Sequence, residues 1–194
     1  MTRIPFIICS VLFFTTSIAG CGSGGKSEST KSPQAQESKM GTRSNPVQFK
    51  KSATIDVEAL DDDLKGYPGK VEMSVTEVVR GVDAQQKLKG MDDTLEETPD
   101  GYEWVLLKVK VKVVELSTKD HPFVIDEIQD FGYVSDNGDV YSGDVVAMAK
   151  PGFDLIEMYK GSEKEGYVAG LVVKGQGAKV KYAGSKGDVF FNLK

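Results

Sequence analysis

The sequence predicts an all-β fold, an antiparallel β-sandwich of immunoglobulin type, preceded by an export signal and a polar tether. Residues Glu103–Leu116 alternate between apolar and other side chains over an unusual length. The rest of the body breaks into short apolar runs with turn residues roughly every 8–12 positions. No long stretch has helical periodicity. With 194 residues, the chain can form one domain with a substantial core plus additional segments.

The segment Glu103–Leu116 is the strand around which the rest of the sheet is expected to form. Apolar side chains recur at every second residue, the spacing that places them on one face of a strand: Val105, Leu107, Val109, Val111 and Val113. The opposite face changes from Leu106 to three lysines, so we expect that end to face solvent. The 14 residues exceed the usual strand length, so we expect a bulge or bend near Val113-Val114.

Two strands and a polar connection are expected before this segment. Ala53–Ala59 alternates weakly, and the alternation resumes at Val71 and continues to Gly81. Ala84–Leu88 is compatible with a helical turn, and Met91–Pro99 with an acidic loop. Loops of this length on a β scaffold often carry binding residues.

Short apolar runs after Leu116 predict further strands. They are Phe123–Ile125, Phe131–Val134, Val140–Met148, Leu155–Tyr159, Gly166–Val173, Lys179–Ala183 and Asp188–Leu193. Asn137-Gly138 predicts a β-hairpin between the second and third runs, because this pair tolerates positive φ. Gly166–Val173 is apolar enough to be a central strand.

The amino-terminal end predicts a lipoprotein. Residues 1–20 read as a signal peptide, with Arg3 before an apolar run of signal-core length. The run ends in Ile18-Ala19-Gly20-Cys21, which resembles a bacterial lipobox. Cleavage is then expected after Gly20, and Cys21 is expected to carry a diacylglycerol that anchors the protein on the extracytoplasmic face of the bacterial cell membrane. The alternative is an ordinary signal peptide with an incidental cysteine.

Composition divides the remainder into a linker and a domain. Residues 21–51 start with the lipidated cysteine and are rich in Gly, Ser, Lys and Gln, so we expect a flexible linker, followed by the β-sandwich domain at 52–194. The domain holds 17 basic and 27 acidic residues, a net charge of −10, which argues against nucleic acid as a partner. Both cysteines, Cys9 and Cys21, precede it, which rules out an internal disulfide or a cysteine-based metal site in the domain.

Few residues of the domain suggest chemistry. His121 stands alone and is expected in a loop, so we predict no catalytic residues, no metal site and no cofactor. Two acidic clusters, Asp61–Asp63 and the acidic residues of the 92–100 loop, could bind calcium, but neither matches a spaced calcium loop. The 92–100 loop could also supply a carboxylate pair for glycan hydrolysis. The other aromatic side chains are expected mostly in the core. Tyr67, in its Gly/Pro loop, is the aromatic residue most expected to contact a partner.

Several short stretches together resemble a family of secreted bacterial lipoproteins, chiefly Gram-positive, whose outer domain is an immunoglobulin-like sandwich. These stretches are Gly41–Pro46, Val75–Gly81, Pro99–Trp104, Phe131–Gly138, Tyr159–Ser162 and Gly166-Tyr167. The resemblance covers about residues 41–194 and extends in fold to the immunoprotective extracellular proteins of actinobacteria. It implies a fold and a location, and it transfers no catalytic or binding residue.

These observations predict a membrane-anchored surface lipoprotein that is not an enzyme. An anchor, a tether and a sandwich without a catalytic constellation suit a binding or interaction module, with an envelope protein or a wall polymer as partner. The alternatives are a carboxylate-dependent envelope glycan hydrolase, and a structural or antigenic surface protein without a tight ligand. The sequence names no residue of the binding site.

Overall fold

The computed structural model describes residues 40–194 of the protein. Strands make up most of this region, with one short helix: β1 Ser52–Leu60, β2 Gly66–Arg80, α1 Gly81–Lys89, β3 Tyr102–Leu116, β4 Phe123–Ile125, β5 Phe131–Ser135, β6 Ile156–Met158, β7 Glu163–Val173, β8 Ala178–Gly184 and β9 Gly187–Asn192. All pairings between these strands are antiparallel. Among the described residues, no helix is long and apolar enough to cross a membrane.

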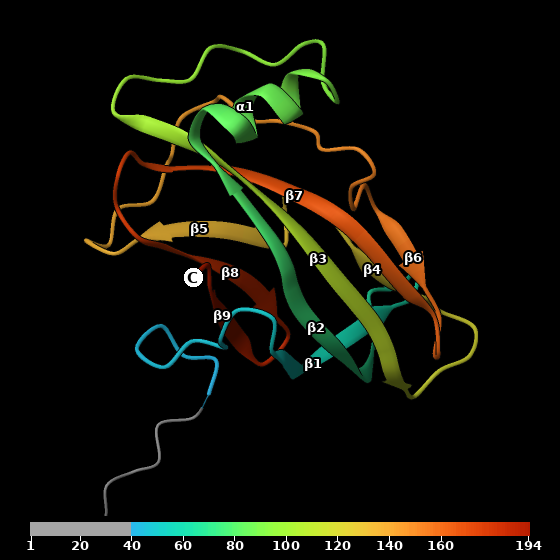
Figure 1. The fold of residues 1–194 in the computed structure, drawn as a ribbon. Helices are drawn as coiled ribbons and strands as arrows, with labels where there is room; N and C mark the ends of the chain where they lie inside the picture. The colour runs from blue at the N-terminus through green and yellow to red at the C-terminus, as the bar shows by residue number, and fades with distance from the viewer. Residues whose placement is uncertain (1–39) are drawn as a thin grey trace, which may run out of the picture. The chain divides into compact units, whose positions relative to one another are not determined.

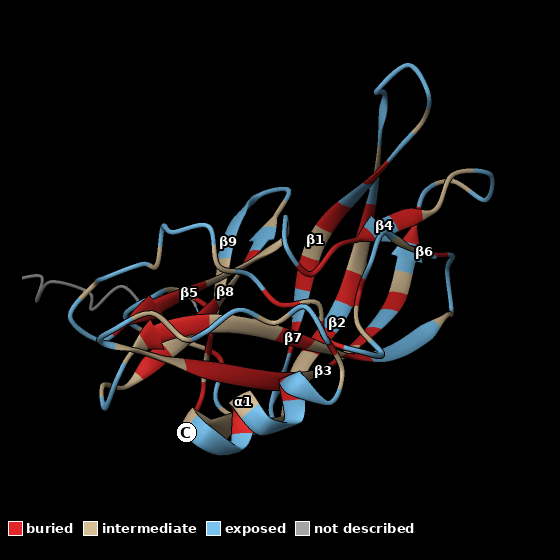
Figure 2. Ribbon diagram, turned by 90° about the horizontal axis from the view of Figure 1, so that it is seen from above, coloured by how far each residue is buried: buried red, intermediate tan, exposed pale blue. Residues whose placement is uncertain are grey.

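The strands form an antiparallel sandwich, which confirms the predicted all-β sandwich. A four-stranded sheet of order β1-β2-β3-β7 lies over a three-stranded sheet of order β5-β8-β9, and β4 and β6 form a separate pair (Figure 1). Buried and exposed positions alternate along β1 and β2 (Figure 2). The main core lies between the sheets and includes Val109, Val111, Val180, Tyr182 and Phe191, each at most 2% exposed.

Strand β3 contacts two different cores. Its residues Val105 to Val113, at alternate positions, face the main core as the sequence predicts. On the opposite face, Trp104 and Leu106 are also buried, in a second core beneath α1 (Figure 1). The predicted bulge is confirmed: Lys70 pairs with Glu115 and Val71 with Val113, which leaves Val114 as the extra residue of β3.

The lysine half of β3 faces outward, beside glutamates of the neighbouring strands. Lys108 lies 2.9 Å from Glu165 and Lys110 lies 2.8 Å from Glu163, both across the β3–β7 pairing. These side chains are more than a third exposed, so the pairs contribute little to stability. Their main effect is to neutralise charge along this face.

Two predictions for the second half of the chain are wrong. Residues 140–148 form an irregular loop and not a strand, and β5 pairs with β8. The Asn-Gly turn does form, with the Ser135 N–H donating to the Asp139 carbonyl at 2.9 Å. The chain then leaves the sheet, because Ala147 and Ala149 pack in the second core. Strand β7, predicted as central, is an edge strand of its sheet.

The folded body begins before Ser52, within the segment predicted as linker. Val47 is fully buried, and its N–H donates to the Phe190 carbonyl at 2.8 Å. Its carbonyl accepts from Asn192 at 2.8 Å, so this segment runs along the free edge of β9. An apolar side chain in an otherwise polar stretch provides the burial that holds it there. The predicted signal peptide, Gly20 and Cys21 lie outside the described residues.

Candidate functional site

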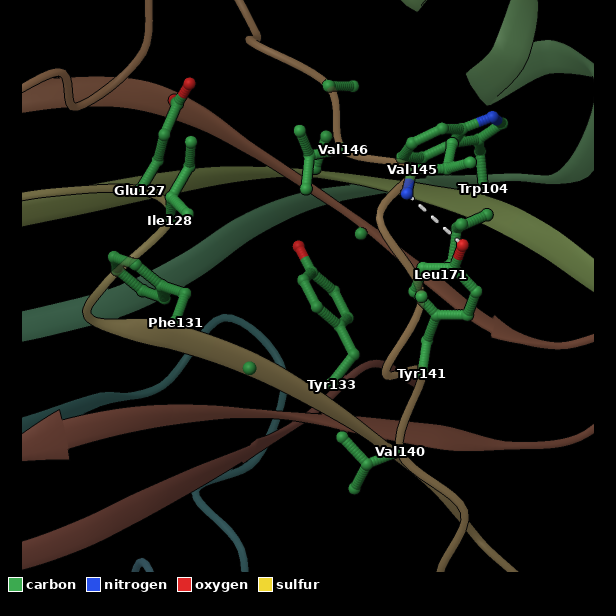
Figure 3. A pocket seen from close by; sticks show the side chains of 15 residues that line it. Trp104, Glu127, Ile128, Phe131, Tyr133, Val140, Tyr141, Val145, Val146 and Leu171 are labelled. Atoms are coloured by element: carbon green, nitrogen blue, oxygen red, sulfur yellow. Dashed lines mark hydrogen bonds between the residues drawn. The ribbon is translucent and has the colours of Figure 1, made fainter. Parts of the chain in front are cut away.

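A pocket opens on the side of the sandwich, between the edge strands β5 and β7 (Figure 3). We call it the side pocket and define it by the segments that line it: Trp104, residues 127–133, residues 140–147 and residues 169–171. Its volume is about 200 Å³. Each of these segments comes from a different part of the chain, so the pocket exists only in the folded protein.

Tyr133 forms the floor of the side pocket. Its ring points from β5 into the space between β5 and β7 (Figure 3), and its hydroxyl donates to the Val168 carbonyl at 3.0 Å. Gly170 makes this possible, because a Cβ at that position would overlap the Tyr133 ring. Burial raises the pKa of Tyr133 well above its ordinary value, so this hydroxyl is a neutral hydrogen-bond donor.

Glu127 is the one ionisable carboxyl that lines the side pocket, and it is only 4% exposed. One carboxyl oxygen, Oε2, accepts from the Phe153 N–H at 3.1 Å, and Oε1 has no partner among the described residues. Burial raises the pKa of Glu127 to about 7, against the lowering effect of the backbone donors Phe153 and Ala149. This carboxyl therefore holds the segment after Ala149 in place.

A second buried polar atom without a partner lies beside the pocket. Trp104 is 1% exposed, and its Nε1 donates to no acceptor among the described residues. An unsatisfied buried donor costs about 1–3 kcal/mol. A ligand or water that accepts from this N–H would remove part of that cost.

Three exposed apolar side chains form the rim of the side pocket. Ile128, Val140 and Val146 are 51%, 55% and 56% exposed, and all three line the opening. Exposed apolar side chains gathered around a concave apolar surface are typical of binding sites. They come from two loops, on either side of the pocket in Figure 3.

The loop 140–149, which covers one wall of the pocket, is held by one hydrogen bond to another segment and by one within the loop. The Met148 N–H donates to Asp92 Oδ2 at 3.1 Å, and Asp92 is only 9% exposed. Within the loop, the Val145 N–H donates to the Tyr141 hydroxyl at 3.3 Å (Figure 3). The Thr94 hydroxyl, together with the backbone donors of Met148 and Thr94, lowers the pKa of Asp92, so this carboxylate stays ionised and keeps the loop attached.

Tyr67 and His121, which the sequence singled out, do not line this pocket. Tyr67 is half-buried in β2, where it stacks on His121 at 5.0 Å between ring centroids and donates to Asp61. The exposed large aromatic side chain of the described region is Tyr159, at 45%. His121 lies in a loop, as predicted. No group of three or more potential metal ligands occurs within residues 40–194.

The lining of the side pocket suits an uncharged or cationic group and disfavours an anion. Its walls are aromatic and aliphatic, and the single carboxyl among them is that of Glu127. The sequence carries only a weak signal for this site. The signal is three apolar residues that stand in segments otherwise rich in turn residues: Ile128, Val140 and Val146. Which of the many loop valines would gather around Tyr133 depends on contacts between distant segments.

Comparison with known proteins identifies no family. No protein-family model matches the chain, and no curated protein matches it. The fold is similar to the crystal structure of YcdA of Bacillus subtilis, described as a candidate lipoprotein, with a TM-score of 0.40 and 16% identity. The match covers 64% of this chain and 36% of YcdA, so the chain spans about a third of the length of that protein. A similarity this low carries no argument about function.

Proposed function

We propose that the protein is a lipid-anchored surface lipoprotein that acts as a non-catalytic binding module, and that the side pocket is where its partner binds. The observation that carries the proposal is a concave aromatic surface, built on Tyr133 and Trp104, that is rimmed by exposed Ile128, Val140 and Val146. Binding energy at protein interfaces concentrates where a bulky group fills such a pocket.

The size of the pocket distinguishes between kinds of ligand. Pockets for small molecules and cofactors enclose about 300–1,000 Å³, whereas the side pocket measures about 200 Å³. That volume suits one bulky side chain of a larger partner, whose remaining surface would rest on the apolar rim. A partner protein of the envelope is therefore favoured over a free cofactor.

The anchor rests on the sequence Ile18-Ala19-Gly20-Cys21. Replacing Cys21→Ser is expected to remove the attachment site of the lipid, so that the protein moves from the membrane fraction to the medium. Immunoblots of fractionated cells measure this change. Cys9→Ser, inside the predicted signal peptide, is the matched control and is expected to leave the protein on the membrane. Retention of the Cys21→Ser variant on the membrane in a form that has lost residues 1–20 would contradict lipid anchoring.

A photo-crosslinking residue at the pocket rim tests the binding role. Benzoylphenylalanine at Val146, in the full chain on intact cells, is expected to form an adduct of discrete size with one partner. A second substitution, Val140→Asp, places a charge on the same rim and is expected to reduce the adduct by about tenfold. Val124→Asp is the matched control, because Val124 is 43% exposed on β4 and does not line the pocket.

Two outcomes would overturn this assignment: no adduct at Val146, or an adduct that Val140→Asp leaves unchanged. Glycan hydrolysis and a purely antigenic role remain predictions of the sequence alone.

A further inference from the structure

The edge of β7 that borders the side pocket has free backbone groups. Its register with β3 runs without a shift from Tyr102–Val173 to Lys112–Glu163. On the far side of β7, the Tyr167 N–H donates to the Pro151 carbonyl at 2.7 Å and the Val173 N–H donates to Ser135 Oγ at 3.1 Å. Because alternate residues of a strand point to the same edge, Ala169 and Leu171 also point away from β3. Within the described residues, neither of these two N–H groups has a partner on that edge.

The edge of β5 that borders the pocket has the same property. Strand β5 pairs with β8 in continuous register from Phe131 to Ser135. The Ser135 N–H points away from β8 and donates to Asp139 at 2.9 Å. By the same alternation, Phe131 and Tyr133 direct their backbone groups away from β8, and within residues 40–194 no other backbone group pairs with them on that side. Two unpaired strand edges therefore border one apolar pocket.

Unpaired edges are normally covered, because they would otherwise pair with other chains. This protein covers the edge of β9 with the segment around Val47, and it covers β7 at Tyr167 with the 151–152 segment. The stretch Ala169–Leu171 is left open at the point where the pocket lies. An open edge beside a side-chain pocket is the arrangement that strand addition uses: backbone hydrogen bonds supply affinity, and the pocket selects one side chain.

We propose that the side pocket binds an extended peptide segment of a partner protein by strand addition to the β7 edge at Ala169–Leu171, with one bulky apolar side chain inserted above Tyr133. The peptide is expected to be neutral or basic. The lining holds one carboxyl, that of Glu127, and no cationic side chain, and the domain carries a net charge of −10. An acidic segment is repelled by both. This inference rests on the proposed binding function and specifies its ligand.

The probe is a displayed library of random linear peptides, selected on the full lipidated chain in detergent micelles and counter-selected on its Val146→Asp variant. Enriched peptides are expected to share one bulky apolar residue and to lack clustered acidic residues. Synthetic copies, N-methylated at one amide at a time, then report on the backbone by fluorescence anisotropy. Methylation of a single amide that bonds to β7 is expected to weaken binding about tenfold, the loss for one hydrogen bond left unmade. Such amides alternate along the peptide, so methylation of an intervening amide is expected to have little effect.

Two variants of the protein test the same backbone bonds by changing β7 in place of the peptide. Ala169→Pro removes the outward N–H of Ala169, and it removes no bond to β3 because that N–H points away from β3. Proline is tolerated on edge strands, so the variant is expected to fold and to weaken peptide binding about tenfold. Ala169→Ser keeps the N–H and is expected to bind as the wild type does. If circular dichroism shows that the proline variant does not fold, the N-methyl scan on the wild-type chain decides whether the peptide binds by strand addition.

The outcomes separate this inference from the proposed function. Peptides that need Val146 but show no alternation in the N-methyl scan would overturn strand addition and leave pocket binding intact. A library that yields no peptide dependent on Val146 would overturn the peptide ligand, whereas the crosslink at Val146 on cells would still report on the binding role.

Discussion

Trp104→Ala is expected to lower the free energy of unfolding by about 3–5 kcal/mol, the range measured for large aromatic side chains removed from cores. Trp104 is 1% exposed and joins three elements: α1 through Ala84 and Leu88, β7 through Leu171, and the loop 140–149 through Ala147. Its loss would leave a cavity beneath α1 that a nine-residue helix cannot close by itself. The same cavity would open into the side pocket, so peptide binding is expected to weaken as well.

Urea denaturation followed by far-UV circular dichroism measures this effect, since Trp104 is the single tryptophan and its fluorescence disappears with the substitution. Trp104→Phe is the matched control. It also removes the Nε1 donor, which has no partner among the described residues, so part of the lost packing is offset. The phenylalanine variant is therefore expected to lose much less stability. A loss below about 1 kcal/mol for alanine would contradict the role of the second core, because surface substitutions cost no more than that.

Glu127 is expected to make the protein less stable as the pH rises. Burial raises its pKa in the folded protein from the ordinary value of 4.5 to about 7. The proton is therefore held more tightly in the folded state than in the unfolded state. The stabilisation is complete below pH 4.5, decreases as the unfolded state ionises, and is gone above pH 7. A shift of this size corresponds to about 3 kcal/mol.

Glu127→Gln is expected to flatten the pH dependence by that amount, while the amide oxygen can still accept from the Phe153 N–H. The measurement is the free energy of unfolding at pH 4, 6 and 8, compared with the wild type. The difference between variants is needed because burial also raises the pKa of Asp130, a carboxyl that is present in both proteins. Glu157→Gln, at an exposed position of β6, is the control. Identical pH profiles for wild type and Glu127→Gln would show that this carboxyl is ionised when buried.

Local alternation predicted most of the strands correctly. Phe123–Ile125 forms β4 with the predicted bounds, and the bulge in β3 falls at Val114, where the predicted strand exceeds the usual length. The lysines of β3 face outward because period-2 spacing determines which side of a strand a residue occupies. The helix at Gly81–Lys89 extends the predicted helical turn. None of these features requires knowledge of what the strand packs against.

The errors occur where distant contacts outweigh a local pattern. Residues 140–148 have the composition of a strand, but Ala147 packs beside Trp104 in the second core, and this contact draws the segment away from β5. Gly166–Val173 is apolar on both faces because the loop 140–149 covers its outer face, not because it lies between two strands. A sequence pattern records burial and cannot distinguish between these two ways of achieving it.

The sequence by itself determined the β class of this protein and the side of each strand that faces the core. These features depend on residue spacing over a few positions. Only the tertiary structure decided that Glu127, Tyr133, Val146 and Leu171 line one pocket, and that this pocket lies beside two open strand edges. Those residues come from four separate segments, and the energy that brings them together arises from packing between sheets and loops, which no local pattern encodes.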